Sequence, residues 1–455
     1  MPRSRRSPRS DSRGAPGRTS SRGDSEGGNA AARKPTRRKS GGSKSSGGFR
    51  RGGGSGPPAD EDALITDQGE FDDFCQRARD ARLVAFDTEF VSESTFRPEL
   101  CLMQFSADGE TVGVDPFELQ DLTPWWDLMT DDRTTVIVHG GQAEVKFCLE
   151  ATGQAPRRLV DVQLAEGLRS TSYPLGYDAL VQRVLNVRPQ KGSQTRTDWR
   201  RRPLSADQLS YALRDAEFLP KIWEIQRKDL QARGRTAWAA AEFVRFVRNL
   251  AEDHRREPHE KLSGLSKLSR RDLAIAREVA LWRWNEAEER NRPVRRILRD
   301  DLVIDVAKRQ PETAEELTAP RDLNRGDIHR SADDILAAIE RGKLVPEEEL
   351  PPRIRREGPD KNPDEHVLGQ LLGIALSSLC NEHEVARTIA GTAKDLRDLV
   401  RWHTAGRPEN VEVPQLAAGW RKDLCGQLLT DLLDGEIALR VADTQGDHPL
   451  AFERD

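Results

Sequence analysis

The strongest constraint on the fold is an apolar run that ends in two carboxylates. Residues 83–90 are Leu-Val-Ala-Phe-Asp-Thr-Glu-Phe, and a short apolar run of this kind is typical of a buried β-strand. Because side chains alternate between the two faces of a strand, Asp87 and Glu89 should lie on the same face. The run therefore predicts a strand that leaves the interior with two carboxylates side by side.

A further carboxylate lies on a predicted helix. Residues 206–228 show a helical pattern that contains Tyr211 and Asp215, and residues four positions apart share one stripe of a helix. Carboxylates that converge from a strand and a helix suit paired divalent metal ions, which prefer hard oxygen ligands. Two such ions can activate a water and hold the leaving oxygen of an in-line phosphoryl displacement. The pattern thus indicates nuclease chemistry.

Four ordered motifs lie between about residues 62 and 230. In chain order they are Phe86-Asp87-Thr88-Glu89-Phe90 with Leu100-Cys101-Leu102-Met103-Gln104, then residues 138–147, 191–199 and 202–215. Their order and spacing resemble those of the ribonuclease D family, in the form whose third motif contains a tyrosine (DEDDy). The resemblance implies an α/β exonuclease domain at residues 61–230, with a ribonuclease H-like mixed sheet and flanking helices.

The resemblance also implies roles for the motif residues. Two divalent ions, Mg²⁺ or Mn²⁺, would be held by four carboxylates: Asp87, Glu89, Glu144 and Asp215. The hydroxyl of Tyr211 would position the attacking water. The structural alternatives are that the acids cap elements or pair with arginines, and that Tyr211 only fills the core.

Other polar residues of the motifs are candidates for substrate contacts. They are Gln104, Lys191 and Gln194, and the last two could equally brace their own loop. His139 ends a predicted strand, a position where histidine more often satisfies a backbone group than touches substrate. We therefore leave His139 out of the predicted site.

One position departs from the family pattern. The second motif of the family carries an aspartate five residues after its histidine, and here that position is Glu144. The extra methylene moves the carboxylate oxygens by roughly one carbon–carbon bond, about 1.5 Å, and metal geometry is sensitive to such shifts. Either the site is adjusted around a longer ligand or activity is reduced. Because the other motif residues are intact, we expect an active enzyme.

The leading interpretation is a 3′-5′ exoribonuclease that trims structured RNA precursors, such as tRNA 3′ ends, and releases nucleoside 5′-monophosphates. A second interpretation is a DNA 3′-5′ exonuclease, because the same motifs occur in proofreading and helicase-linked nucleases. A third is an RNA-binding scaffold with a weakened nuclease site, motivated by Glu144. RNA is the expected partner, and no obligate protein partner is evident.

Strand-like and helical segments alternate through the first half of the chain. Strands are predicted at residues 83–90, 100–106, 111–114 and 135–139, and helices at residues 71–79, 142–150, 177–185 and 206–228. This alternation predicts an α/β domain with a mixed sheet.

After residue 230 the strand patterns stop and the chain is predicted to be helical. A helical connector at residues 231–264 leads to residues 265–345, which resemble the HRDC domain shared by RecQ-type helicases and ribonuclease D. A linker rich in proline and charge, residues 346–364, precedes a third segment, residues 365–455. That segment resembles the C-terminal region of longer ribonuclease D homologues, and we predict a second all-α, HRDC-like domain.

The net charge of −4 hides an asymmetry between the first residues and the rest. Residues 1–58 hold 15 Lys and Arg against three acids, whereas the rest of the chain holds 57 against 73. The first 60 residues are also rich in Ser and Gly, so they should form a disordered basic tail. We predict an arm that contacts RNA phosphates, and the alternative is a solubilising tail without a partner.

The cysteines and the hydropathy indicate a reducing compartment. The five cysteines are scattered, odd in number and free of C-x-x-C pairs, which argues against a disulfide framework or a zinc site. No apolar run approaches the length of a membrane span, and no signal-peptide core follows Met1. We expect a cytoplasmic protein.

Overall fold

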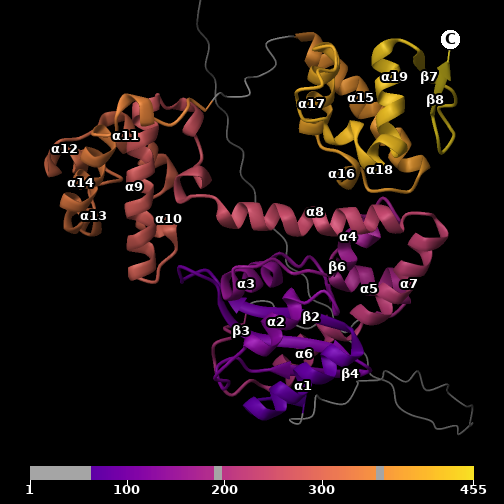
Figure 1. Cartoon of the computed structure of the whole chain (residues 1–455), viewed down its shortest axis with the longest axis horizontal. Coiled ribbons are helices and arrows are strands. Elements are labelled where there is room, and N and C mark those ends of the chain that lie inside the picture. The colour runs from indigo at the N-terminus through magenta and orange to yellow at the C-terminus, as the bar shows by residue number, and fades with distance from the viewer. Residues whose placement is uncertain (1–62, 189–196, 355–362, 455) are drawn as a thin grey trace, which may run out of the picture. The chain divides into compact units, whose positions relative to one another are not determined.

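The computed structural model describes residues 63–188, 197–354 and 363–454 (Figure 1). The basic tail and the residues Lys191 and Gln194 lie outside the described residues. The predictions made for them are therefore carried forward as predictions.

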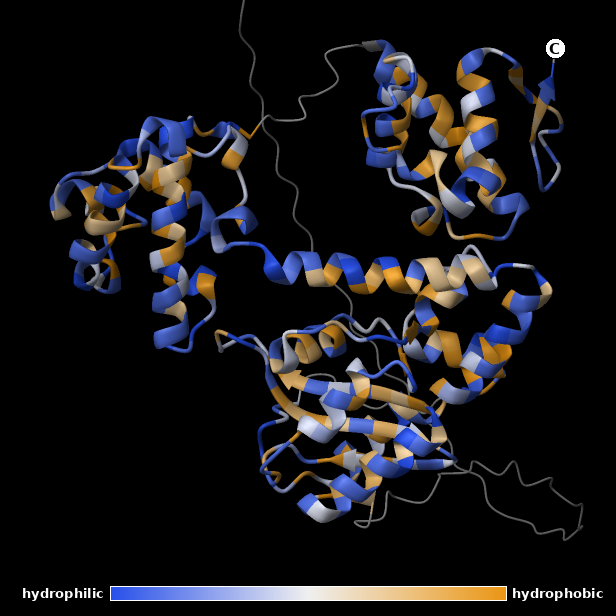
Figure 2. Ribbon diagram, viewed as in Figure 1, coloured by the Kyte–Doolittle hydropathy of each residue, from blue (hydrophilic) through white to orange (hydrophobic). Residues whose placement is uncertain are grey.

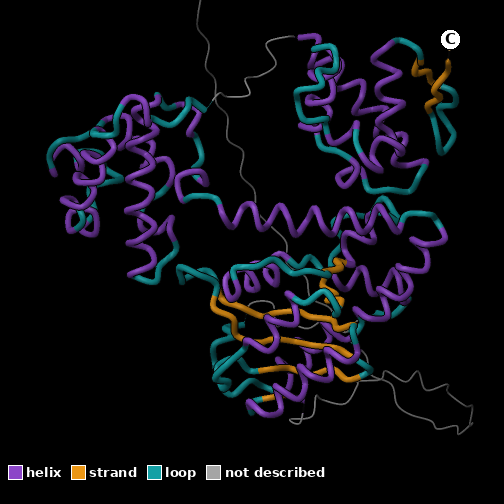
Figure 3. Tube along the Cα trace, viewed as in Figure 1, coloured by secondary structure: helices purple, strands orange, loops and turns teal. Residues whose placement is uncertain are grey.

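The first half of the chain forms a six-stranded mixed sheet with strand order β1-β4-β3-β2-β5-β6. Figure 3 draws the strands in orange. The strands are β1 (Leu64–Ile65), β2 (Leu83–Val91), β3 (Glu99–Ala107), β4 (Glu110–Val114), β5 (Thr135–Val138) and β6 (Leu159–Asp161). Strand β3 is antiparallel to β2 and β4, and the other three pairs are parallel. The predicted mixed sheet is confirmed, and each predicted strand is present with slightly different ends.

One face of the sheet carries a core of aromatic residues. The Phe86 ring stacks on Phe105 with centroids 5.1 Å apart, and Trp125 tilts against Phe86 at 4.8 Å. Side chains of three helices complete this core: α1 (Gln68–Ala81), α2 (Thr123–Thr130) and α3 (Gln142–Thr152). These bulky side chains fill one face of the sheet, while the carboxylates of β2 project from the other.

The opposite face is covered by two helices where the sequence predicted one. The predicted helix at residues 206–228 divides into α6 (Ala206–Glu217) and α7 (Leu219–Ala232), which meet at Phe218. Pro220 lies in the first turn of α7, where a missing N–H costs nothing, but inside one long helix it would remove a hydrogen bond. The prediction of a single helix is therefore wrong, although both motif residues fall within α6.

Three more helices surround this domain. They are α4 (Val162–Gly167), α5 (Tyr177–Leu185) and the long α8 (Thr236–Arg255). Helix α8 occupies most of the predicted connector, and apolar residues recur along it between hydrophilic ones (Figure 2). Short 3₁₀ helices follow at Pro258–Lys261 and Leu265–Lys267.

The next region is helical and has its own core. Its helices are α9 (Arg270–Glu289), α10 (Val294–Ile297), α11 (Asp300–Arg309), α12 (Ala314–Thr318), α13 (Gly326–Arg330) and α14 (Ala332–Lys343). A capping box of Ser269 and Asp272 starts α9, whose apolar side chains form the centre of the cluster. A 3₁₀ turn, Glu347–Glu349, closes the region.

The last region is mainly helical but ends in a β-hairpin. Its elements are α15 (Pro363–Glu382), α16 (Arg387–Ala390), α17 (Ala393–Thr404), the 3₁₀ helix Gln415–Ala417, α18 (Gly419–Arg421), the π-helix Lys422–Gly426, α19 (Gln427–Asp434), β7 (Ile437–Val441) and β8 (Leu450–Arg454). The antiparallel β7–β8 pair corrects the prediction of an all-α segment. The assignment of this segment as a second HRDC-like domain stays a prediction.

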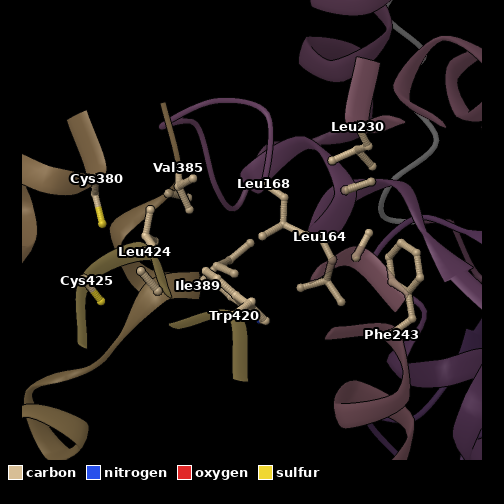
Figure 4. Packing of buried hydrophobic residues seen from close by; sticks show 14 of the residues in the cluster. Leu164, Leu168, Leu230, Phe243, Cys380, Val385, Ile389, Trp420, Leu424 and Cys425 are labelled. Atoms are coloured by element: carbon tan, nitrogen blue, oxygen red, sulfur yellow. The ribbon is translucent and has the colours of Figure 1, made fainter. Parts of the chain in front are cut away.

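The last region packs against α4 and α8 through a shared apolar cluster. Ile389 and Trp420 lie beside Leu164 and Leu168 in this cluster (Figure 4). A side chain at Gly167 would collide with Ile389, since its Cβ would lie 2.3 Å from the isoleucine Cδ1. The absence of that side chain thus lets the two regions approach closely.

A buried ion pair crosses the same contact. Glu242 of α8 accepts a hydrogen bond of 2.6 Å from Arg421 and one of 2.9 Å from the indole N–H of Trp420. The side chains of Glu242 and Arg421 are 1% and 5% exposed, so neither charge can be satisfied by bulk water. The contact therefore depends on both partners being in place.

Two sequence expectations concern the chain as a whole. All five cysteines are buried free thiols in the structure. Within the described ranges, no helix combines the length and the apolar character that a membrane crossing requires.

Candidate active site

Strand β2 places the first two carboxylates. Asp87 pairs with Gln104 of β3 and Glu89 pairs with Leu102, so both acids project from the face that α6 covers. The register shifts between Glu89 and Phe90, where the pairing of β2 with β3 is irregular. Both carboxylates are partly exposed at this point, while Val84, Ala85 and Phe86 before them are buried.

Helix α6 places Tyr211 and Asp215 over the same face. A capping box fixes its start: Gln208 N–H donates to Ser205 Oγ, and Ser205 N–H donates to Gln208 Oε1. At Gly113 of β4, a Cβ would lie only 3.0 Å from Leu209 Cδ1, so the glycine lets α6 lie close to the sheet. Local capping and a missing side chain together bring the helix to the carboxylates of β2.

Helix α3, whose apolar side chains pack in the aromatic core, carries Glu144. The turn that precedes α3 contains two glycines: Gly140 has a φ of +65°, and a Cβ on Gly141 would lie 2.3 Å from Val138. Only glycine fits both requirements, and the tight turn puts Glu144 in the first turn of α3. The side chain of Glu144 is 4% exposed.

A hydrogen bond ties Glu144 to the strand of the first two acids. The hydroxyl of Thr88 donates to Glu144 Oε1 over 2.6 Å, and both groups are buried. This bond fixes the orientation of the Glu144 carboxylate relative to β2. It holds one of the two carboxylate oxygens in place.

The four carboxylates are electrostatically coupled around Asp87. Burial raises the pKa of Asp87 to about 6. Burial, followed by repulsion from Asp87, raises the pKa of Glu89, of Glu144 and of Asp215 to about 8. Among the described residues, no basic side chain is a leading influence that offsets this rise in the four pKa values. The site is therefore a partly buried acidic cluster without an internal counter-charge.

The donor chemistry of this cluster fits divalent cations. Carboxylate oxygens are the ligands that Mg²⁺ and Mn²⁺ prefer, and a cation would replace the protons that the raised pKa values retain. Within the described part of the chain, no three His, Cys, Asp or Glu side chains are grouped as closely as ligands around an ion. The fit therefore rests on the donor set and its electrostatics.

Tyr211 lies next to the carboxylates as a neutral hydroxyl. Burial, and then repulsion from Asp215 and Glu89, raises the pKa of Tyr211 to about 12. Its ring stacks beside Trp199 with centroids 6.3 Å apart. The hydroxyl thus stays protonated at neutral pH and can both donate and accept a hydrogen bond.

The remaining predicted residues differ in their surroundings. Gln104 is fully buried, and neither its amide oxygen nor its amide nitrogen has a hydrogen-bond partner in the described structure. A direct substrate contact by Gln104 therefore requires the covering side chains to move. His139 Nε2 lies 2.9 Å from the Leu175 carbonyl oxygen, which confirms the prediction that it satisfies a backbone group.

Two acids near the site were not predicted. Asp161 is buried at the end of β6 and accepts hydrogen bonds from the N–H groups of Gly140 and Gly141, which brace the turn that carries Glu144. Asp178 of α5 is among the charges that raise the pKa of Asp215. The run Leu159-Val160-Asp161 repeats, in shorter form, the pattern of an apolar strand that ends in a carboxylate.

Comparisons with known proteins agree with this geometry. The family described as "3'-5' exonuclease" matches residues 63–231, and the family described as "HRDC domain" matches residues 272–339. Ribonuclease D of Nitrobacter hamburgensis is 34% identical over 381 residues, covering 83% of this chain and 97% of that protein. Ribonuclease D of Zymomonas mobilis is 31% identical over 389 residues, covering 83% of this chain and 95% of its own length.

A solved structure shows the same arrangement. The crystal structure of Escherichia coli RNase D, described as an exoribonuclease involved in structured RNA processing, superposes with a TM-score of 0.70 at 25% identity. The match covers 82% of this chain and 98% of the other. The likeness therefore extends through the helical regions and is not confined to the sheet.

Proposed function

The chain belongs to the ribonuclease D family, and we propose that this 3′-5′ exoribonuclease trims structured RNA precursors such as tRNA 3′ ends. The family implies that it acts on RNA and depends on divalent metal. The observation that carries the proposal is the acidic cluster around Asp87, to which β2, α3 and α6 each contribute.

Each site residue has a proposed role. Four carboxylates would hold two Mg²⁺ or Mn²⁺ ions: Asp87, Glu89, Glu144 and Asp215. Such ions supply activation of water and neutralisation of charge on the scissile phosphate. The Tyr211 hydroxyl would orient the attacking water toward the terminal phosphodiester, so that nucleoside 5′-monophosphates leave one at a time. The hydrogen bond from Thr88 would keep Glu144 in position.

Matched RNA and DNA oligonucleotides test the proposal. The wild-type chain should release 5′-monophosphates from RNA 3′ ends with Mg²⁺ or Mn²⁺ present, and EDTA should stop the reaction. Asp87→Asn and Asp215→Asn each remove a charge from the ligand set, so the rate should fall by about 10²-fold or more. Asp207→Asn is the matched control, because Asp207 is an exposed acid in the first turn of the same helix.

Each alternative predicts a different result. Equal or faster degradation of DNA would favour the DNA exonuclease. Tight RNA binding with no metal-dependent degradation of either oligonucleotide would favour the scaffold. Near-wild-type rates in both Asp87→Asn and Asp215→Asn would show that the acidic cluster takes no part in the reaction.

A further inference from the structure

A second concave site lies at the other end of the sheet. A pocket of about 890 Å³ is bounded by the turn between α3 and β6, by α7 and by α8. Leu83 and Thr135, the first residues of β2 and β5, also line it. Asp87 lies four residues further along β2, or about 13 Å at the rise of a strand, so the pocket is separate from the acidic cluster.

The pocket gathers positive charge in a part of the chain that is otherwise acidic. Its lining includes five arginines and a single acid, Glu224, and the arginines are Arg157, Arg158, Arg227, Arg248 and Arg255. Glu224 is already engaged by Lys221 at 2.8 Å and by Lys228 at 2.7 Å. Beyond residue 58 the chain has 57 Lys and Arg against 73 acids, so this concentration of arginine departs from its surroundings.

Most of these guanidinium groups are available to a ligand. Arg157, Arg227 and Arg255 are exposed, and within the described residues their side chains have neither a hydrogen-bond nor an ion-pair partner. Arg248 has one weak neighbour, Glu252, at 3.8 Å. An arginine on a convex surface is usually only hydrated, but here five converge on one concavity.

The floor of the pocket is apolar and partly aromatic. Trp223 and Phe243 meet edge to face with centroids 5.9 Å apart, and Val247 and Ala251 continue the floor along α8. Trp223 is only partly buried, so part of its ring is accessible. Aromatic rings that accept bases, combined with arginines that accept phosphates, are the usual elements of a site for single-stranded nucleic acid.

We propose that this arginine pocket binds a segment of the RNA substrate away from its 3′ end. The proposal rests on the proposed function, because it assumes that RNA is the ligand. A mononucleotide would engage only part of the set, because the arginines come from three separate segments. On α8 alone, Arg248 and Arg255 are about 10 Å apart along the helix axis. A chain of phosphates matches this spread.

The test compares two double variants in an Asp87→Asn background, where bound RNA is not consumed. Arg227→Gln/Arg248→Gln removes two charges from the pocket. The control, Arg77→Gln/Arg440→Gln, removes two charges elsewhere from side chains that are similarly exposed, at 56% and 57%. Affinity for a labelled RNA is measured across a salt series, and thermal melting verifies that each variant is folded.

The pocket variant should bind RNA several-fold more weakly at low salt. Its slope of log affinity against log salt should be flatter by about 1.4, or about 0.7 for each phosphate contact that is lost on a single strand. With Asp87 restored, the same substitutions should raise KM for long RNA but leave the turnover of a dinucleotide unchanged. An unchanged slope, or an equal loss in the control, would overturn the proposal.

The binding measurement is independent of catalysis. If the wild-type chain degraded no RNA, the proposed function would fail, while the salt series would still decide whether the pocket binds RNA. Displacement of the labelled RNA from the pocket by low concentrations of AMP would show a mononucleotide site and would overturn the proposal as stated.

Discussion

The negative charge of Asp87 repels each of the other three acids of the site. Its charge contributes to the raised pKa of Glu89, of Glu144 and of Asp215. Because burial is the largest cause in each case, the acids retain protons to unusually high pH when no cation is bound. The affinity of the site for metal and its protonation should therefore be linked.

In the metal-free chain, the contribution of Glu89 and Asp215 to stability should fall as pH rises from about 4 to about 8. Glu89 and Asp215 ionise in the folded chain only at about pH 8, whereas their ordinary pKa values are 4.5 and 3.8. The folded chain thus binds more protons than the unfolded chain in this window, so raising the pH favours unfolding. Melting temperatures in EDTA, taken as the difference between wild type and Asp215→Asn, measure this contribution.

Added Mg²⁺ or Mn²⁺ should reverse the trend. A divalent cation that binds the ionised acids competes with protons, so it should raise the melting temperature more at pH 8 than at pH 6. A metal-induced rise that is the same at both pH values would contradict the linkage.

Tyr211→Phe should slow the chemical step without unfolding the chain. The substitution removes only the hydroxyl and keeps the packing against Trp199. If the hydroxyl orients the water, single-turnover rates should fall by about 10²-fold, while stability changes by less than about 0.5 kcal/mol. Tyr173→Phe is the control, because Tyr173 packs in a different apolar cluster. Equal rates in the two variants would show that Tyr211 only fills the core.

At the scale of elements, the sequence predicted the strands and helices that have a strong local pattern. Strand β2 was predicted from the apolar run that ends in two acids, and helix α6 from the helical spacing of Tyr211 and Asp215. The break at Phe218 was missed because apolar residues continue across it, although Pro220 indicated it. Asp161 was missed because its role depends on backbone N–H groups about 20 residues away, which no local pattern reveals.

The C-terminal hairpin was missed for a related reason. Strands β7 and β8 are short, and only the first residue of β7 is buried, so the alternation of polar and apolar residues is weak. Long, half-buried elements are therefore predictable here, while edge elements and tertiary contacts are not.

Removing Glu242 should weaken the contact between helix α8 and the C-terminal region. Glu242→Ala leaves the buried guanidinium of Arg421 without its carboxylate, which typically costs about 3–5 kcal/mol. Denaturant unfolding followed by tryptophan fluorescence measures this, since Trp420 stacks on Trp238 with centroids 4.9 Å apart. Arg440→Gln breaks an exposed pair instead and should cost less than about 1 kcal/mol. A cost for Glu242→Ala no larger than for this control would show that the ion pair contributes little.

At the scale of the whole molecule, charge is divided unevenly along the chain. Residues 1–58 hold 15 Lys and Arg against three acids, and the remainder carries an excess of acids. Long-range attraction of RNA should therefore come disproportionately from the first 58 residues, together with local basic sites such as the arginine pocket.

Deleting residues 1–58 should weaken RNA binding mainly at low salt. The slope of log affinity against log salt should become flatter by roughly 2–5 units, because only some of the 15 cations can contact phosphates at once. Turnover at saturating RNA should hardly change, since no predicted metal ligand lies in this segment. A chain in which these Lys and Arg residues are replaced by glutamine keeps the length of the segment but loses its charge, so it separates the two effects. Superimposable salt series would leave the segment without a role in binding.

The contact between α8 and the C-terminal region has a topological consequence. Arg235 at the start of α8 donates to the carbonyl of His383, and Glu242 binds Arg421, so the chain returns to the nuclease domain after the HRDC domain. The HRDC domain is therefore an insertion, with its entrance and its exit both anchored to one body. A single cut between Leu344 and Pro363 would not release the C-terminal piece, because the buried contacts hold it. The nuclease domain and the last region thus form one packed unit, although the HRDC domain separates them in the sequence.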